Sequence, residues 1–548
     1  MRTIQYLLLF LTASYLAAQS TDIPLGSAAY PTLDEWDAKS EMGFFTGVKP
    51  ISRRYIADFY AHAPKSLSNA DAFDKSAIYL QTRHYLEDSL QKNSGLFNRF
   101  FKLPTDFLAV HTEDFQLHVD PIWVFGGGRE SASDELIYQN YRGLQLWGTI
   151  DDKVSFYALL NENQARYPTY VRNMTDSTIA IPFEGFWKQY QETGVDFLRA
   201  QAYIDFNATK HISAQFGYGK HFIGNGIRSL VLSDVGNNYP YLRLNTRVWK
   251  IQYTNIFAQL VGETYGGDFG LLGVGSFPKK YLATHRLSIK PTPNLTLSLF
   301  ESVIYGDSTN SFKVEYMNPL IFYLALEQQD GSADNVLIGL DFKWNLFKRI
   351  SLYGQLLIDE LIVGEAFSDS GWWGNKVGLQ AGIQYFDAFG IDNLDMQVEF
   401  NRVRPYTYSH EDNYGSYTHY NMALAHPLGA NFEEMLLSGS YRPLDRLKIS
   451  GTLLMARYGD DIGTASFGRD PLKSYNARLE DYGVNIGQGV LTNLHLFRAN
   501  ATYMIYHNLA VEAGFTYRKE HAEGADPEIT KIGTLGLRWN FPARSYLF

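Results

Sequence analysis

From about residue 116 onward, apolar and polar residues alternate along the chain with a period of two. The run 195–206 shows an apolar set opposite a polar set: Leu198, Ala200, Ala202, Ile204 and Phe206 against Arg199, Gln201, Tyr203 and Asp205. Successive side chains of a strand point to opposite faces. In a membrane barrel one face meets lipid and the other meets the lumen. We therefore expect the apolar set to face lipid.

The alternating pattern divides into eighteen runs, which we interpret as strands. Their approximate bounds are 116–125, 143–150, 154–161, 195–206, 211–218, 241–248, 251–260, 281–290, 295–305, 336–345, 350–358, 376–386, 394–403, 435–442, 447–457, 494–506, 509–517 and 532–541. The pattern predicts an all-β fold, a transmembrane antiparallel β-barrel of about 18 strands that occupies residues 116–548.

The connections between the runs alternate in length. Those after even-numbered runs are tight, as at Asp151–Lys153, Trp249–Lys250 and His507–Asn508. Those after odd-numbered runs are longer, and the first is expected at 126–142. Outer-membrane barrels have short periplasmic turns and long external loops. The alternation therefore predicts an even number of strands with the long loops outside the cell.

The residues before the barrel have a different character. Residues 1–19 predict a cleaved signal peptide, because Arg2 precedes an apolar stretch that ends in small residues. In residues 20–115, the segment 76–90 has apolar side chains at helical spacing, and Asp58–His62 predicts another short helix. Asp71 and Asp74 are candidate caps for the first of these helices. We expect 20–115 to form a small periplasmic helical section that plugs the barrel.

Composition supports a membrane barrel and removes other classes. The chain has 38 Tyr, 36 Phe and 9 Trp, and aromatic rings gather at the two membrane interfaces of such barrels. A net charge of −10 argues against a nucleic-acid partner, which would need a basic face. The chain has no cysteine, which excludes a disulfide framework and a thiol nucleophile.

The last residues also fit a barrel. Leu535, Leu537, Trp539 and Phe541 alternate with small or polar residues, and the sequence ends at Phe548. A final strand close to an aromatic end is typical of barrels in bacterial outer membranes. We therefore expect the last strand to close the wall at 532–541.

Four segments in the long connections and at adjoining strand ends have a distinctive composition: Phe216–Arg243, Glu315–Asn335, Leu352–Glu360 and Glu399–Asn431. At these segments the chain resembles the capsule assembly protein Wzi family of outer-membrane barrels. The version of the pattern is that of Bacteroidota, whose members include gliding-motility (RemB-like) proteins. The stretches Gly224–Asp234, Asn318–Asn335 and Arg402–His410 are the most specific parts of the likeness.

The resemblance implies an eighteen-stranded barrel, partly closed by N-terminal helices, that holds capsular or other surface polysaccharide at the cell exterior. The segments themselves suit sugars, because rings stack on sugar faces and arginines pair with uronic acid carboxylates. The same residues would also serve as a lumenal network that fills the barrel, and both interpretations stay open. The candidate residues are Arg228, Asp234, Tyr239, Arg243, Asn318, Glu327, Asp334, Asn335, Asp359, Glu360, Glu399, Arg402, Arg404, Tyr406, Tyr408, His410, His419 and His426.

Enzymatic and metal-binding interpretations have less support. His410, His419 and His426 do not have the helical spacing of a zinc protease. Ser409 and His410 are adjacent, so in a strand their side chains point to opposite faces and do not form a nucleophile pair. We predict no catalytic residue, no cofactor and no metal.

The leading hypothesis is a non-enzymatic outer-membrane barrel that binds or organises surface polysaccharide. Its expected partners are membrane lipids and that polysaccharide. The first alternative is an accessory of gliding motility or secretion machinery that docks surface proteins, with Trp372 and Trp373 in an apolar docking patch. The second alternative is a passive porin, which needs an open lumen.

Overall fold

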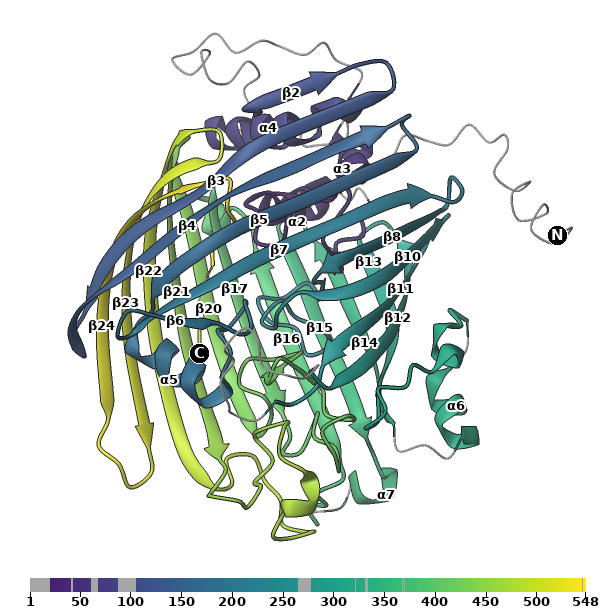
Figure 1. The fold of residues 1–548 in the computed structure, drawn as a ribbon, viewed down its shortest axis with the longest axis vertical. Coiled ribbons are helices and arrows are strands. Elements are labelled where there is room, and N and C mark those ends of the chain that lie inside the picture. The colour runs from purple at the N-terminus through teal and green to yellow at the C-terminus, as the bar shows by residue number, and fades with distance from the viewer. Residues whose placement is uncertain are drawn as a thin grey trace, which may run out of the picture.

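The computed structural model describes residues 20–40, 43–60, 68–86, 105–264, 277–320, 322–330, 334–366, 368, 370–544 and 546–548. Within them, eighteen wall strands form one closed antiparallel barrel (Figure 1). Each wall strand pairs with the next along the chain, and the last pairs with the first through Trp539 opposite Trp123. The predicted fold class is confirmed.

The wall strands are β3 (Phe115–Glu130), β4 (Ser133–Ile150), β5 (Val154–Arg166), β7 (Gly194–Asn207), β8 (Ile212–Gly219), β10 (Tyr239–Val248), β11 (Ile251–Val261), β12 (Lys279–Thr292), β13 (Leu295–Tyr305), β14 (Asn335–Leu346), β15 (Ile350–Glu360), β16 (Lys376–Tyr385), β17 (Leu394–Val403), β20 (Phe432–Leu444), β21 (Leu447–Asp460), β22 (Val490–Tyr506), β23 (Leu509–Ala522) and β24 (Glu528–Trp539). Two short strands, β2 (Leu108–His111) and β6 (Lys188–Tyr190), pair with β3 and β7 respectively. Each predicted run corresponds to one wall strand.

The first hairpin differs most from the prediction. β3 and β4 extend far enough that their connection is only residues 131–132, so the long connection expected at 126–142 is wrong. The cause is Gly126–Gly128, which hides the alternation because glycine has no side chain. The backbone of these glycines still pairs with Ile137–Gln139 of β4.

The wall has an apolar outer face and a polar inner face. On β7, the outward side chain of Leu198 is 67% exposed, whereas the inward side chain of Arg199 is 9% exposed. The same alternation continues with Ile204 outside and Asp205 inside. Large apolar side chains on the outside of a closed barrel are stable in lipid. The protein is therefore a transmembrane β-barrel.

Helices enter the barrel at the end where the wall strands are joined by short turns, which we call the plug end (Figure 1). The plug consists of α2 (Ala29–Ser40), α3 (Arg53–Tyr60), α4 (Asn69–Thr82) and the 3₁₀ helix η2 (Arg83–Tyr85). Among the described residues, no helix is both long and apolar enough to cross a membrane.

The plug helices only partly match the sequence prediction. The N-cap of α4 is Ser68, and Asp71 lies inside the helix and completes a capping box: Asp71 Oδ2 accepts a hydrogen bond from Ser68 N, while Ser68 Oγ accepts one from Asp71 N. Asp74 instead pairs with Arg442 of β20. Helix α2 was not predicted, since its buried face includes acidic residues that disrupt an apolar stripe. The predicted signal peptide, 1–19, and residues 87–90 of the predicted helix lie outside the described residues.

At the opposite end, which we call the loop end, most connections are longer, with the turn 131–132 and residues 523–527 as exceptions, and several fold back into the lumen. They contain α5 (Thr169–Thr178), η3 (Val314–Met317), α6 (Tyr323–Asp330), α7 (Val363–Ala366), η5 (Tyr475–Ala477) and a small hairpin of β18 (Thr418–His419) and β19 (Met422–Ala423). A further 3₁₀ helix, η4 (Ala388–Gly390), lies in a plug-end turn. Buried apolar side chains from the loop-end connections join those of the wall in one large core.

The last residues leave the wall and turn into the lumen. β24 ends at Trp539, and Asn540 adopts a left-handed φ of 51°. Pro542 then lacks the N–H that a ladder would need. Phe541 and Phe548 are buried in the lumenal core, where the label C lies in Figure 1. The expected last strand is present, but Phe548 packs inside the barrel.

Buried ion pairs join the plug to the wall. Lys343 Nζ of β14 lies 2.8 Å from Asp34 Oδ1 and 3.1 Å from Asp37 Oδ2, both on α2. Burial by itself raises the pKa of Asp34, but the ammonium groups of Lys343 and Lys49 hold that pKa below its ordinary value. The plug is thus fastened by charges that are largely withdrawn from water.

Replacement of this lysine should loosen the plug. Lys343→Met leaves two buried carboxylates without their cation, which costs about 3–5 kcal/mol. We expect faster proteolysis of residues 20–86 and a lower melting temperature of the barrel on gels. Lys348→Met, an exposed lysine on the same hairpin, is the control and should behave as wild type. Equal protease resistance of the two variants would contradict the anchoring role.

The same anchor should depend on pH. The folded pKa of Asp34 is below its unfolded value, so its stabilisation is complete above about pH 4 and is lost as the pH falls through the folded pKa. The difference in melting temperature between wild type and Asp34→Asn should therefore be constant at neutral pH and shrink below about pH 4. A difference that does not change with pH would show that the Asp34 charge contributes nothing.

Candidate functional site

The centre of the lumen is occupied by residues 220–238, which connect β8 to β10 and which we call the lumenal segment. Its strand β9 (Phe222–Ile223) pairs with β1 (Val48–Lys49) of the plug. Further along, the carbonyl of Leu230 accepts a hydrogen bond of 2.7 Å from the hydroxyl of Tyr408 at the loop end. The lumenal segment therefore connects the plug to the loop end through the middle of the barrel.

Glu399 of β17 holds this segment from the wall. Its buried carboxylate accepts hydrogen bonds from the backbone N–H groups of Ile227 (2.6 Å) and Arg228 (3.0 Å) and from the hydroxyl of Tyr353 (2.8 Å). Gly226 allows this approach, because a Cβ atom there would lie 2.4 Å from Glu399 Oε2. The lone pairs of Glu399 are thus used within the protein.

Arg228 forms a second buried link. Its Nη2 and Nε donate to Glu434 Oε1 and Oε2 at 2.8 and 3.2 Å, a bidentate geometry. Its Nη2 also donates to the carbonyl of Leu547 in the C-terminal residues. His426 Nε2 lies 2.9 Å from the same carboxylate, and burial lowers the pKa of His426. Wall, lumenal segment and chain end meet at this network.

The other candidate histidines have separate partners. His419 Nδ1 accepts a hydrogen bond of 2.9 Å from Val261 N, and burial lowers the pKa of His419 to about 3. His410 is nearly buried and its ring lies against that of Tyr475. His410, His419 and His426 therefore face three different environments.

Most remaining candidates are also held by contacts within the protein. The contacts are Asp234 O with Lys220 Nζ (2.9 Å), Tyr239 Oη with His221 N (3.2 Å), Asp334 Oδ2 with Tyr316 Oη (2.7 Å), Asn335 Nδ2 with Gly415 O (2.9 Å), Asp359 Oδ2 with Tyr408 N (2.6 Å), Glu360 Oε2 with Lys376 Nζ (3.0 Å) and Tyr406 Oη with Ser466 O (3.0 Å). Within this set, Glu360 is exposed at the loop end.

Four candidates lie outside the lumen, and one of them is Asp334, whose Oδ2 accepts from Tyr316 Oη in the connection that carries α6. Arg402 faces outward from β17, with its side chain 52% exposed beside Glu433. Asn318 and Glu327 belong to the connection that carries α6, which packs on the outer face of the wall (Figure 1). There the Tyr323 ring stacks on His285 of β12 at 4.4 Å. The structure does not bring these four candidates to the lumenal network.

Four aromatic side chains gather at the loop end, and we call them the aromatic rim: Trp372, Trp373, Tyr475 and Tyr482. Their ring centroids are 5.0 Å apart for Trp372 and Tyr482, 5.8 Å for the two tryptophans and 5.0 Å for Trp373 and Tyr475. Tyr482 is 56% exposed, and the other three rings are partly exposed. The rim is thus a row of neighbouring rings, tilted against one another, that reach solvent in part.

Cations lie directly against this surface. The Arg478 guanidinium is 3.9 Å from the Trp373 ring centroid, and Lys376 Nζ is 4.5 Å from that of Tyr475. Stacked guanidinium and ammonium groups are attracted by the ring faces. Arg478, whose side chain is partly exposed, is also placed to pair with an anion that sits on the rings, whereas Lys376 is buried.

Arg404 contacts the backbone of the segment that carries the two tryptophans of the rim. Its Nε and Nη2 donate to the carbonyls of Asn375 (2.7 Å) and Trp372 (3.2 Å). The backbone of Trp373 also donates to the carbonyl of Asp481 at 3.0 Å. Arg404 is therefore placed to position the rim through backbone carbonyls.

The sequence analysis singled out Trp372 and Trp373 but missed the other half of the rim. Tyr475, Arg478 and Tyr482 lie in the connection between β21 and β22, far along the chain from the tryptophans. The available signal was a pair of tyrosines beside an arginine in a long connection. It identifies a ring surface only when the fold brings the two connections together.

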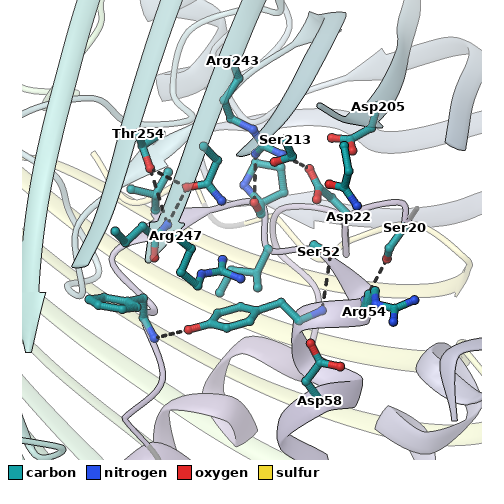
Figure 2. Close-up of a pocket in the computed structure, with 18 of the residues that line it drawn as sticks. Ser20, Asp22, Ser52, Arg54, Asp58, Asp205, Ser213, Arg243, Arg247 and Thr254 are labelled. Carbon is teal, nitrogen blue, oxygen red and sulfur yellow. Dashed lines mark hydrogen bonds and ion pairs between the residues drawn. The ribbon is translucent and has the colours of Figure 1, made fainter. Parts of the chain in front are cut away.

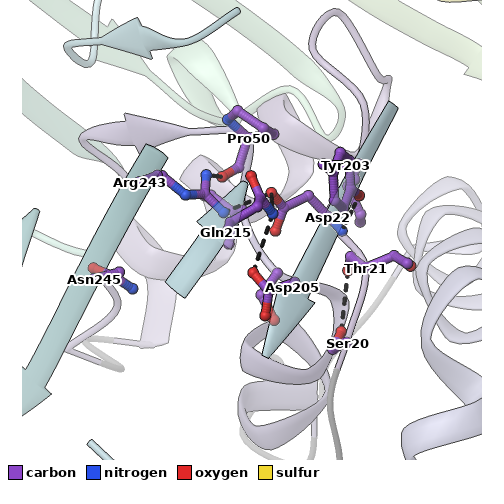
Figure 3. Close-up of polar contacts among 12 residues, drawn as sticks. Ser20, Thr21, Asp22, Pro50, Tyr203, Asp205, Gln215, Arg243 and Asn245 are labelled. Carbon is purple, nitrogen blue, oxygen red and sulfur yellow. Dashed lines mark hydrogen bonds and ion pairs between the residues drawn. The ribbon is translucent and has the colours of Figure 1, made fainter. Parts of the chain in front are cut away.

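Arg243 lies in a different place, at the plug end. There a cavity of about 300 Å³ separates plug and wall (Figure 2). Arg243 Nη2 donates to Asp22 Oδ2 at 2.7 Å, and Gln215 Nε2 donates to the same oxygen and to Asp205 Oδ2, each at 3.1 Å (Figure 3). Arg247 also lines this cavity and covers the ring of Tyr55 at 3.3 Å. Arg243 thus joins plug and wall.

A closed barrel with a helical plug at one end and inward-folded loops at the other defines a class of transmembrane barrel with a filled lumen. Residues 153–531 match the model of the family described as capsule assembly protein Wzi. The chain belongs to this family, and the predicted resemblance to the Wzi family is confirmed. The Bacteroidota, gliding-motility branch of the family stays a prediction. No curated protein matches the chain in sequence.

Among the solved structures that are similar to this chain, the first of the following three supports a shared fold. Wzi of Escherichia coli, described as an outer membrane protein involved in group 1 capsule assembly and a carbohydrate binding β-barrel, aligns over 97% of this chain and 100% of its own, with 13% identity and a TM-score of 0.57. OprD of Pseudomonas aeruginosa aligns over 77% of this chain and 94% of its own, with 10% identity and a TM-score of 0.42. OccK3 of the same organism covers 77% and 95%, with 11% identity and a TM-score of 0.41.

The Arg228 network can be tested by matched arginine variants. Arg228→Met leaves the Glu434 carboxylate buried beside His426 without its main cation, which costs about 3–5 kcal/mol. We expect a markedly lower unfolding temperature in heat-modifiability gels. Arg402→Met removes an exposed arginine of the wall and should change stability by less than about 0.5 kcal/mol. If both variants unfold at the same temperature, the buried network does not stabilise the barrel.

Proposed function

We propose that this protein is an outer-membrane barrel that binds capsular or another surface polysaccharide at the cell exterior through the aromatic rim. The observation that carries the proposal is the ring surface of Trp372, Trp373, Tyr475 and Tyr482 with Arg478 stacked on it. Sugars offer apolar faces to such rings. Membership in a capsule assembly family supports the same conclusion.

The orientation follows from the loop lengths. Short turns belong to the periplasmic side of outer-membrane barrels and long connections to the outside. The plug end then faces the periplasm, and the aromatic rim faces the medium where capsule is held. A cleaved signal peptide at 1–19 would bring the chain to that membrane.

The cations beside the rim suit acidic glycans. Arg478 and Lys376 flank the rings, and a guanidinium pairs well with a uronic acid carboxylate. Glu360, which lies 3.0 Å from Lys376 Nζ, would compete for that cation. Arg478 is paired as well, since its Nε donates to Asp481 Oδ1 at 2.7 Å, but its side chain is 21% exposed against 3% for that of Lys376. Arg478 is therefore the more accessible partner for an acidic sugar. We propose retention of the glycan without catalysis, in keeping with a family defined by capsule assembly.

Removal of two rim rings should weaken polysaccharide binding. Each stacking contact contributes about 0.5–1.5 kcal/mol, so Trp372→Ala with Tyr482→Ala should raise the Kd for isolated surface polysaccharide roughly tenfold or more. Binding is measured by biolayer interferometry on detergent-purified full-length protein. Trp249→Ala is the control, because Trp249 is 78% exposed in a plug-end turn. Unchanged binding by the double variant would remove the rim from the proposal.

Protein docking is the alternative that one observation favours. Leu479 lies next to the rim and is 64% exposed, and an apolar patch with a polar edge also suits a protein partner. Deletion of the gene separates the two functions. Loss of capsule retention supports polysaccharide binding, whereas loss of surface spreading or of secreted adhesins with capsule intact supports docking. In the described part of the chain the filled lumen gives no support to a porin.

A further inference from the structure

Three histidines meet at the plug end, away from the network and rim described above. They are His84 of η2, His111 of β2 and His118 of β3. One ring nitrogen of each lies within 4.8 Å of those of the other two. The ring centroids are 4.3 Å apart for His84 and His118 and 4.9 Å for His111 and His118. Three separate elements therefore bring imidazoles to one point.

Two of these histidines bury a nitrogen that has no protein partner. His84 Nε2 and His118 Nε2 are both buried and make no hydrogen bond within the part of the chain that the structure describes. A buried polar atom left unsatisfied costs about 1–3 kcal/mol. Such atoms therefore call for an explanation, and a bound metal ion is one that fits converging imidazoles.

The surroundings of His118 resemble the outer shell of a metal site. Asp106 Oδ2 lies 3.1 Å from His118 Nδ1 and 2.9 Å from Arg83 Nη2. His118 Nδ1 makes no hydrogen bond in the described part of the chain, but a carboxylate this close to it favours a proton on Nδ1 and leaves Nε2 as the ligand. Trp147 stacks on the His118 ring with centroids 3.9 Å apart and restrains its plane. The His118 ring is thus oriented from two sides.

We propose that His84, His111 and His118 bind a divalent transition-metal ion, for which Zn²⁺ is the best match. Three imidazole nitrogens with an open fourth position form a familiar zinc set. With Zn–N bonds of about 2.1 Å, tetrahedral donors lie about 3.4 Å apart. The three rings would therefore move together by an ångström or so on binding. His111 is exposed and leaves a path for the ion.

The ion would fasten the plug to the wall. His84 closes the plug helices, whereas His118 belongs to the first wall strand and His111 to the short strand paired with it. Binding to all three would stabilise the docked plug by mass action, since the ligands converge only in the folded state. Sequence spacing did not reveal this site, because His84 is far along the chain from the other two.

The test uses tag-free, full-length protein in detergent, stripped with a chelator and titrated with Zn²⁺ and with Co²⁺. We expect one Zn²⁺ per chain by calorimetry and slower proteolysis of residues 20–86 with the metal. Bound Co²⁺ should give the strong visible absorption of a four-coordinate site. His111→Ala, an exposed position that the fold tolerates, should weaken binding by at least about 100-fold and abolish the Co²⁺ spectrum.

The control is His211→Ala, which removes an exposed histidine from another plug-end turn and should bind like wild type. Three results would overturn the proposal: no binding by the wild type, equal binding by His111→Ala, or a weak six-coordinate Co²⁺ spectrum. None of these outcomes depends on polysaccharide, so failure here leaves the proposed function standing.

Discussion

Every charge that the wall turns into the lumen needs a partner, because an ion buried without one costs several kcal/mol. In this protein several of the partners come from chain segments that enter the barrel. Lys343 pairs with Asp34 and Asp37 of the plug, and Arg243 pairs with Asp22. These pairs make the plug an integral part of the barrel, and the bonds from Arg228 to Glu434 and Leu547 do the same for the lumenal segment and the chain end.

The wall could be predicted from the sequence because the alternation that specifies it is local. The apolar Leu198 can be assigned to the outer face and the charged Arg199 to the inner face from the local sequence alone, without knowing which residues they contact in the fold. The filling of the lumen depends on contacts between residues far apart in the chain, such as Tyr408 with Leu230. Such contacts produce no repeating pattern in the sequence. For the same reason, Asn318 and Glu327 were grouped with the lumenal residues although their connection lies on the outer wall.

The aromatic rim rests on this filled interior. The hydrogen bond from Trp373 N to Asp481 O joins the two connections that carry the rim. Arg404 donates to the backbone carbonyl of Trp372 and so holds the connection that carries the two tryptophans. Arg404 lies in the segment after β17, the strand that also carries Glu399 and its bonds to the lumenal segment. A binding surface held rigid in this way loses little entropy when a ligand binds. The barrel therefore acts as a scaffold that presents a preformed surface.

The central claim is that plug, lumenal segment and loops fill the barrel, so that it presents a surface and does not conduct. Single-channel recording of the full-length protein in a planar bilayer tests this most directly. The account predicts no steady ionic current from the wild type and a measurable current once the plug, residues 20–86, has been deleted together with the lumenal segment. A stable, ohmic open channel in the wild type would contradict it.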